Sequence, residues 1–259
     1  MKRIAGLGLF TAVLALGQQP PLIIPHLADG STGEGSRWRT TIVLFNSYSL
    51  QVARVSVVFR GGEGTRLAVP LANHGVVSSV EVDMLAQTSV YLETTGASPN
   101  AQVGWIEVNQ QSGLWPVKGY AIFRQMAPGR PDYEAVAMGT RASRTLTFPF
   151  DNTNGVVTSF AVVNLSPSSC GIEVSPAYEE SGTSLLGAPK LIAQAAPNGH
   201  LAFVSTDRLP ELANRRGYLT FASGINCAPG GFAMMGLRFN PYGPFTNLQP
   251  LTNPAPPEF

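Results

Sequence analysis

The sequence predicts an all-β protein that consists of two tandem antiparallel β-sandwich domains after an N-terminal signal peptide. Three observations predict this class: the composition, an internal repeat, and apolar residues that alternate with a period of two. The 259 residues include 27 glycines and 21 prolines, whereas charged residues make up only 13%. Many turn-forming residues and few charges suit short strands joined by turns and argue against long helices. Hydrophobic residues make up 44%, which is enough for a packed core.

The N-terminus has the layout of a secretory signal peptide. Lys2 and Arg3 precede an apolar run from Ile4 to Leu16, and small residues at Ala15 and Gly17 form a cleavage site. The run is shorter than the roughly 20 residues that a helix needs to span a bilayer. We therefore expect residues 1–17 to be removed, with no membrane span left, and the mature protein to be secreted, periplasmic or on the cell surface.

The remainder of the chain repeats itself. Asp29 leads into WRTTIVLFN, which ends at Asn46, and Asp151 leads into VTSFAVVN, which ends at Asn164. Three further pairs follow in the same order at an offset of about 110 to 120 residues: Tyr91 with Ala202, Gly104 with Gly217, and Gly119 with Gly236. The repeat predicts one domain over residues 18–143 and a second over 144–249. The proline-rich tail, 250–259, should be extended.

Within each copy the apolar residues alternate as they do in strands. Ala53, Val55, Val57 and Phe59 share one face of a segment whose other face is polar. The stretch TTIVLFN is apolar on both faces, which predicts a central strand covered from both sides. Each copy holds seven or eight such strands, as a two-sheet sandwich requires. The segment from Asp207 is expected to form a helical turn within a loop.

One stretch resembles a known kind of module. Trp38, Thr40, Ile42, Leu44 and Asn46 form the pattern W-x-T-x-I-x-L-x-N, which is followed by a turn and VARVSVVF. This pattern resembles immunoglobulin- or fibronectin-like sandwich modules, and the tandem resembles uncharacterised exported bacterial proteins with the same paired module. The resemblance implies a sandwich fold outside the cytoplasm. It carries over no catalytic residue.

Cys170 and Cys227 are the only cysteines. In an oxidising compartment a pair of cysteines is most simply a disulfide. The three histidines show no metal-ligand spacing relative to them, so we expect neither a metal site nor a cofactor.

The acidic stretches that open each copy are interpreted as turns. Asp and Asn bond their own backbone two residues on, and glycine takes positive φ freely, so Asp29 and Asp151 are expected to shape bends. A weak cation site at Asp151 is the alternative. The spacing after Asp151 fails the EF-hand pattern, and neither stretch reads Asp-Thr-Gly, as an aspartic protease would require.

No nucleophile or phosphate-binding motif is present, so the sequence predicts a protein that is not an enzyme. Two acidic pairs, Glu81/Asp83 and Asp132/Glu134, lie two residues apart on expected strands. A glycoside-active hydrolase with strand-borne carboxylates is therefore one alternative. A solvated strand face is the favoured interpretation.

Aromatic residues of the first copy give the only indication of a binding site. In GWIEV, Trp105 and Glu107 share the face opposite Ile106, and Trp115 and Tyr120 follow closely. An aromatic beside a polar residue on an outer face suits a sugar platform or a protein contact. The other interpretation is that Trp105 packs against the neighbouring domain or under a loop.

Together these features predict an exported, non-enzymatic binding or structural protein of the cell envelope or exterior. The net charge of +1 makes nucleic acid a poor partner. A protein or a glycan at the cell surface is the expected partner. A carbohydrate-binding protein that uses the exposed aromatics is the first alternative function.

Overall fold

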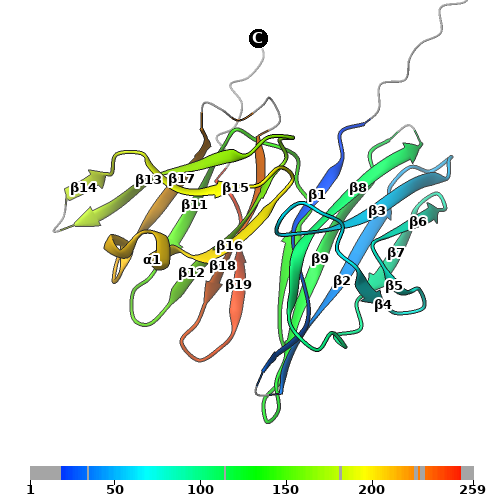
Figure 1. Ribbon diagram of the computed structural model, residues 1–259, viewed down its shortest axis with the longest axis horizontal. Helices are drawn as coiled ribbons and strands as arrows, with labels where there is room; N and C mark the ends of the chain where they lie inside the picture. The colour runs from blue at the N-terminus through cyan, green and yellow to red at the C-terminus, as the bar shows by residue number, and fades with distance from the viewer. Residues whose placement is uncertain are drawn as a thin grey trace, which may run out of the picture.

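A computed structural model describes residues 19–33, 35–113, 115–180, 183–224, 227 and 231–251. The predicted signal peptide and residues 252–259 of the tail lie outside this part of the chain. Nearly every element is an antiparallel strand, and the strands form two lobes that lie side by side (Figure 1). We call residues 19–143 the first half and residues 144–251 the second half.

The first half forms two sheets. One has the order β1-β8-β3-β6 and the other β7-β2-β9-β10, and the end of β1 also pairs with the start of β2. A short hairpin, β4-β5, lies outside both sheets. The strands are β1 (Leu22–Gly33), β2 (Ser36–Asn46), β3 (Ala53–Gly61), β4 (Val69–Leu71), β5 (Gly75–Val77), β6 (Ser79–Met84), β7 (Thr88–Glu93), β8 (Gln102–Ser112), β9 (Lys118–Met126) and β10 (Tyr133–Met138).

The second half also forms two sheets. One contains β11-β17-β13, with both β14 and β15 paired to β13, and the other has the order β16-β12-β18-β19. The elements are β11 (Thr145–Asp151), β12 (Val157–Asn164), β13 (Cys170–Glu180), β14 (Thr183–Leu186), β15 (Lys190–Ala195), β16 (His200–Val204), α1 (Ser205–Arg208), η1 (Pro210–Leu212), β17 (Arg216–Ser223), β18 (Phe232–Phe239) and β19 (Phe245–Leu248). The expected helical turn after Asp207 is present as α1 and η1.

The strand orders of the two halves match. In one pair of sheets β1-β8-β3-β6 corresponds to β11-β17-β13-β15, and in the other β7-β2-β9-β10 corresponds to β16-β12-β18-β19. The predicted all-β class with antiparallel sheets is confirmed. The immunoglobulin-like type and the division into two domains at residue 143 stay predictions.

The residues that were predicted from the alternating pattern to face the interior form part of the hydrophobic core. Ala53, Val55, Val57 and Phe59 are all buried in the first half. In the second half an aromatic group of Phe148, Phe160 and Phe221 fills the space between the sheets, with ring centroids 4.9 to 6.2 Å apart. The predicted disulfide joins Cys170 at the start of β13 to Cys227.

The two halves share buried apolar surface. The outer face of the β16-β12-β18-β19 sheet packs against the side of the first half that contains β1 (Figure 1). Ala161 and Met235 on this face belong to the hydrophobic core of the first half. Beside them, Ile23 and Trp105 pack against Val163 and Ala233.

The connection between the halves is held by backbone hydrogen bonds on both sides. Thr140 exchanges two bonds with Ile23 of β1, at 2.7 and 2.9 Å. Three residues later, Ser143 exchanges two bonds with Phe232 of β18, at 2.8 and 2.9 Å. The connection therefore forms a bridge with each half and is not a free linker.

Candidate ligand-binding face

The structure places Trp105 between the two halves. Its side chain is 1% exposed, and its Nε1–H donates a hydrogen bond to the carbonyl oxygen of Asn198 at 3.0 Å. Trp105 therefore packs against the second half and does not form an exposed platform. It cannot offer its ring to a ligand on the surface.

Glu107 is held in an ion pair. Its Oε2 accepts a hydrogen bond from Nε of Arg60 at 2.7 Å, and both side chains are largely buried. The Arg60 guanidinium also lies 5.6 Å from the ring centre of Trp105. This arrangement ties β3 to β8 and leaves the Glu107 carboxylate already paired.

Trp115 is accessible at one end of the first half. It is 59% exposed in the β8–β9 connection, and its ring centre lies 6.1 Å from that of Tyr48. Gln110 fixes this connection, because its Nε2 donates to the Trp115 carbonyl at 3.0 Å and its Oε1 accepts from the Val117 amide at 2.9 Å. The pair Tyr48–Trp115 is thus a small exposed aromatic site.

Tyr120 lies on the outer face of the β7-β2-β9-β10 sheet, within a row of large side chains that runs across four strands. The strand register places Tyr91, Val43, Tyr120 and Met138 directly beside one another on β7, β2, β9 and β10. Tyr91 is 64% exposed and Met138 48% exposed, whereas Val43 is buried beneath its neighbours. We call this row the aromatic face.

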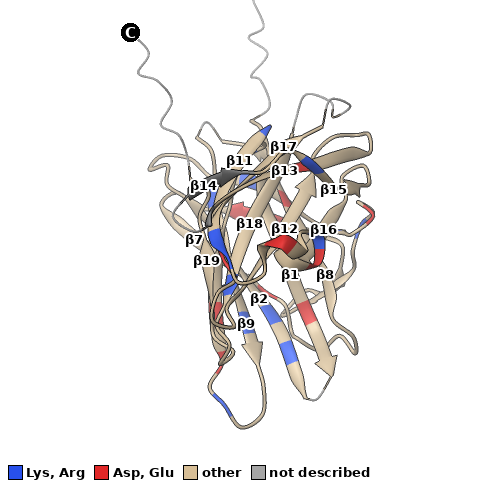
Figure 2. Ribbon diagram, turned by 90° about the vertical axis from the view of Figure 1, so that its left-hand side faces the viewer, with Lys and Arg blue, Asp and Glu red and all other residues tan. Residues whose placement is uncertain are grey.

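Polar groups border the aromatic face. On one side the next row contains Ser89, Phe45 and Lys118. On the other side the row contains Glu93, Thr41, Ile122 and Val136, and the Thr41 hydroxyl donates to Glu93 Oε1 at 3.2 Å. In the view of Figure 2, basic and acidic positions are interspersed over the strands and do not form a block of one sign. Polar side chains therefore lie on both sides of the aromatic face, and apolar side chains lie between them in the same rows.

The strand spacing fixes the distance between the two tyrosines. Tyr91 and Tyr120 flank β2 from opposite sides, so their strands lie two inter-strand steps apart, or about 10 Å. This spacing places the two tyrosines at a separation comparable to the length of a disaccharide unit. Tyr120 was among the predicted site residues, whereas Tyr91 and Met138 were not, because only the pairing of β7 and β10 in the sheet brings these two residues beside it.

TTIVLFN departs from expectation in the same region. Its inner residues Ile42 and Leu44 are buried, but among the residues that the structure describes no further layer covers its outer face, where Phe45 is 40% exposed. The prediction of a strand covered from both sides was wrong for β2. In the second half, by contrast, strand β12 is covered from both sides, because its outer residues Ala161 and Val163 pack against the first half.

The two acidic residues that open the repeats have separate structural roles. The Asp151 Oδ1 accepts a hydrogen bond from the Thr153 amide at 3.1 Å, and Asn154 and Gly155 take positive φ, so the predicted turn is confirmed. Desolvation raises the pKa of Asp151, but hydrogen bonds from Thr153 and Arg238 outweigh it and hold the pKa below its ordinary value.

Asp29 lies within strand β1 and not in a turn, which corrects the expectation for this residue. It is fully buried, and its carboxylate accepts hydrogen bonds from the Gly96 amide and the Ser98 hydroxyl, each at 2.6 Å. Gly30 follows with φ of 99°, and a Cβ there would meet the Asn100 carbonyl oxygen at 2.5 Å. The strand and the 94–100 loop therefore approach too closely for any residue but glycine.

In each acidic pair considered for hydrolysis, one carboxylate is hydrogen-bonded to an arginine. Asp83 accepts two hydrogen bonds from Arg54 at 2.6 and 2.7 Å, and Glu134 accepts one from Arg124 at 2.6 Å. These side chains lie on exposed strand faces. Among the residues that the structure describes, no group of three or more His, Cys, Asp or Glu side chains is placed to hold a metal ion. Within the same residues, no helix is long and apolar enough to cross a membrane.

Comparison with known proteins gives no relative: no protein-family model, curated protein or solved structure matches this chain.

Proposed function

We propose that the chain is an exported, non-enzymatic binding protein and that it holds a glycan on the aromatic face. The observation that carries this proposal is the row of Tyr91, Val43, Tyr120 and Met138 on one uncovered sheet face. Export rests on the signal-peptide layout of residues 1–17.

The chemistry of the face suits a sugar. Pyranose rings present a flat face of C–H groups that stacks on aromatic rings, and their hydroxyls need hydrogen-bond partners at the edge. Tyr91 and Tyr120 supply the rings. Lys118, Thr41 and Glu93 supply donors and acceptors on either side. A row of side chains that crosses four strands suits an extended chain better than a single buried sugar.

A protein partner is the second candidate, and one observation favours it. The corresponding face of the second half, on β16-β12-β18-β19, packs against another β-sheet structure, namely the first half. The aromatic face could receive a protein surface in the same manner. Large aromatic and Met side chains are enriched at such interfaces.

A glycan array of the mature protein, residues 18–259, tests the proposal. We expect binding to extended polysaccharides and a loss of about tenfold in affinity for Tyr91→Ala, since an aromatic stacking contact contributes about 1–1.5 kcal/mol. Tyr218→Ala is the matched control, because Tyr218 is 43% exposed on β17 in the other half. Trp115→Ala measures the contribution of the Tyr48–Trp115 pair.

An array without any bound glycan would overturn the carbohydrate assignment. Equal loss in the Tyr91 and Tyr218 variants would place the site elsewhere. If glycans do not bind but Tyr91→Ala abolishes capture of a defined surface protein, the second candidate replaces the first.

A further inference from the structure

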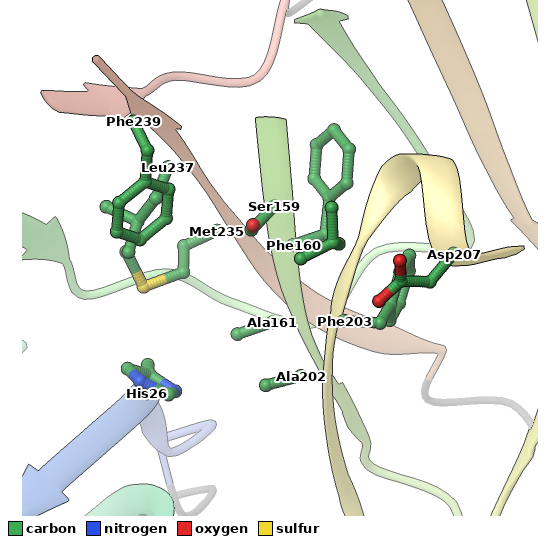
Figure 3. A pocket seen from close by; sticks show the side chains of 11 residues that line it. His26, Ser159, Phe160, Ala161, Ala202, Phe203, Asp207, Met235, Leu237 and Phe239 are labelled. Atoms are coloured by element: carbon green, nitrogen blue, oxygen red, sulfur yellow. The ribbon is translucent and has the colours of Figure 1, made fainter. Parts of the chain in front are cut away.

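A groove with a volume of about 350 Å³ lies in the second half, where it meets the first half at His26. The side chains that line it come from β1, β12, β16, β18 and helix α1 (Figure 3). Most are apolar, and the size falls within the range of small-molecule sites. They are His26, Ser159, Phe160, Ala161, Ala202, Phe203, Val204, Asp207, Met235, Leu237 and Phe239.

The floor of the groove is open because its side chains are small. Ala161 on β12 pairs directly with Ala202 on β16, and Ser159 lies two residues before Ala161 on the same face. At the corresponding positions of the first half the sheet carries Val43 and Tyr91. Ala202 is exposed, so β1 of the first half covers only part of this floor.

One wall of the groove is apolar, and a histidine lies at one end. Met235, Leu237 and Phe239 follow one another on the same face of β18 and stand along one side of the groove. The His26 ring closes the end nearest the first half (Figure 3). His26 is held there by a contact of 3.2 Å between its Nδ1 and Nε2 of His200, and burial lowers its pKa to about 4, so the ring is neutral near pH 7.

Asp207 is the only charged side chain in this lining at neutral pH. It projects from α1, an element that has no counterpart between β7 and β8 of the first half. Its carboxylate is turned towards the groove (Figure 3), and within the described part of the chain it takes part in no hydrogen bond or ion pair. A carboxylate at the edge of an apolar groove attracts a cation that carries an apolar body.

We propose that this groove binds a small organic cation, an amine with an apolar body. The apolar part lies over Ala161 and Ala202 and against Met235, and the ammonium pairs with the Asp207 carboxylate. This site goes beyond the glycan proposal and does not depend on it, because it uses none of the residues of the aromatic face.

Methyl-¹³C methionine NMR of the mature protein tests the site, because Met235 lines the groove. The probes are n-octylammonium, n-octanol and n-octanoate, which share the apolar chain and differ in charge. We expect a saturable shift of the Met235 methyl signal with octylammonium, weaker binding of octanol and the weakest binding of octanoate. Asp207→Asn should weaken octylammonium about threefold and leave octanol unchanged, as expected for an exposed ion pair.

Variants that fill the groove complete the test. Ala202→Trp places a large ring on the floor at an exposed position. If that variant fails to fold, Ser159→Leu fills the floor with a branched apolar side chain instead. Either should abolish the Met235 shift, whereas Tyr91→Ala should leave it unchanged and thereby separates this site from the glycan site. The absence of a saturable shift, equal binding of octylammonium and octanoate, or full binding by a folded groove-filling variant would each overturn the proposal.

Discussion

At the scale of single residues, the two halves repeat a hydrogen-bonded asparagine. Asn46 ends β2 and Asn164 ends β12, and both are buried. Each side-chain amide donates to three backbone carbonyls, and each Oδ1 accepts the amide two residues further on, which is Tyr48 in one half and Ser166 in the other. The carbonyls belong to Gln51, Met84 and Leu85 in the first half and to Ser168, Ala195 and Ala196 in the second.

Replacement of either asparagine should therefore destabilise the protein strongly. In Asn46→Ala or Asn164→Ala three carbonyls lose their donor inside the fold, and we expect a loss of about 2–4 kcal/mol in the free energy of unfolding. Urea denaturation measures it. Ser47→Ala, at an exposed neighbouring position, is the control and should change the stability by less than about 0.5 kcal/mol. A loss below 1 kcal/mol in both asparagine variants would contradict this role.

The contacts of individual side chains could not be predicted from the sequence. Both asparagines were visible as landmarks of the repeat, but the carbonyls that they bind lie up to 39 residues away. Trp105 and Tyr218 occupy corresponding places in β8 and β17, yet Trp105 is 1% exposed and Tyr218 43%. The difference arises because one half covers the other, and local sequence does not record this packing.

At the scale of elements, strands were predictable and their neighbours were not. Alternation in β3 identified its buried face correctly, since that pattern depends only on whether one side is covered. Asp29 was assigned to a turn because it precedes glycine, but the chain continues as strand to Gly33 before it reverses. The aromatic face required the register of β7, β2, β9 and β10, which pairs residues far apart in the sequence.

The disulfide stabilises one edge of the second half. Cys170 begins β13, and Cys227 follows β17 in the segment that leads to β18. The two cysteines are separated by 57 residues. In the chain-entropy model this link stabilises the folded state by about 4 kcal/mol, because it restricts the unfolded chain.

The double variant Cys170→Ala/Cys227→Ala should accordingly lower the free energy of unfolding by about 3–4 kcal/mol in urea. The same loss should follow when the unmodified protein is unfolded under reducing conditions. The variant itself should show no response to the reductant, which serves as its internal control. Equal stabilities of the oxidised and reduced protein would show that the link contributes nothing.

At the scale of the whole molecule, the contact between the halves decides which surfaces are available. The outer face of β16-β12-β18-β19 is partly covered, while the corresponding face of the first half is open. The two copies of the repeated unit therefore present different surfaces: the second half has a groove at the contact, and the first half has the exposed aromatic face. The repeat was predictable from sequence landmarks. The contact was not, because the apolar residues that form it resemble those of an ordinary core.

A pair of histidines makes this contact sensitive to pH. His26 and His200 come from opposite halves, with their ring nitrogens 3.2 Å apart, and His26 also meets the ring of Phe123 edge-on. Burial lowers the pKa of His26 to about 4, and burial together with the charge of His26 lowers that of His200 to about 3. Both rings are therefore neutral in the folded protein near pH 7, and unfolding frees them to bind protons at their ordinary pKa of 6.5.

The sign of the effect follows from this difference. Above pH 6.5 neither state binds these protons, so the stability is at its full value. As the pH falls below 6.5, the two histidines bind protons in the unfolded state. In the folded state they stay unprotonated until the pH reaches about 4. Each histidine then removes about 1.4 kcal/mol per pH unit, and we expect a total loss of about 3–5 kcal/mol between pH 7 and 4.5.

Urea denaturation at pH 7, 6, 5 and 4.5 measures this loss. The double variant His26→Leu/His200→Gln should lose most of the slope between pH 6.5 and 4.5, whereas His74→Gln, at an exposed position, should keep it. Asp151, whose pKa is lowered by its partners, contributes in a separate window, since its stabilisation is lost only as the pH falls below its ordinary pKa of 3.8. A native protein whose stability stays constant from pH 7 to 4.5 would show that these histidines are not held neutral at the contact between the halves.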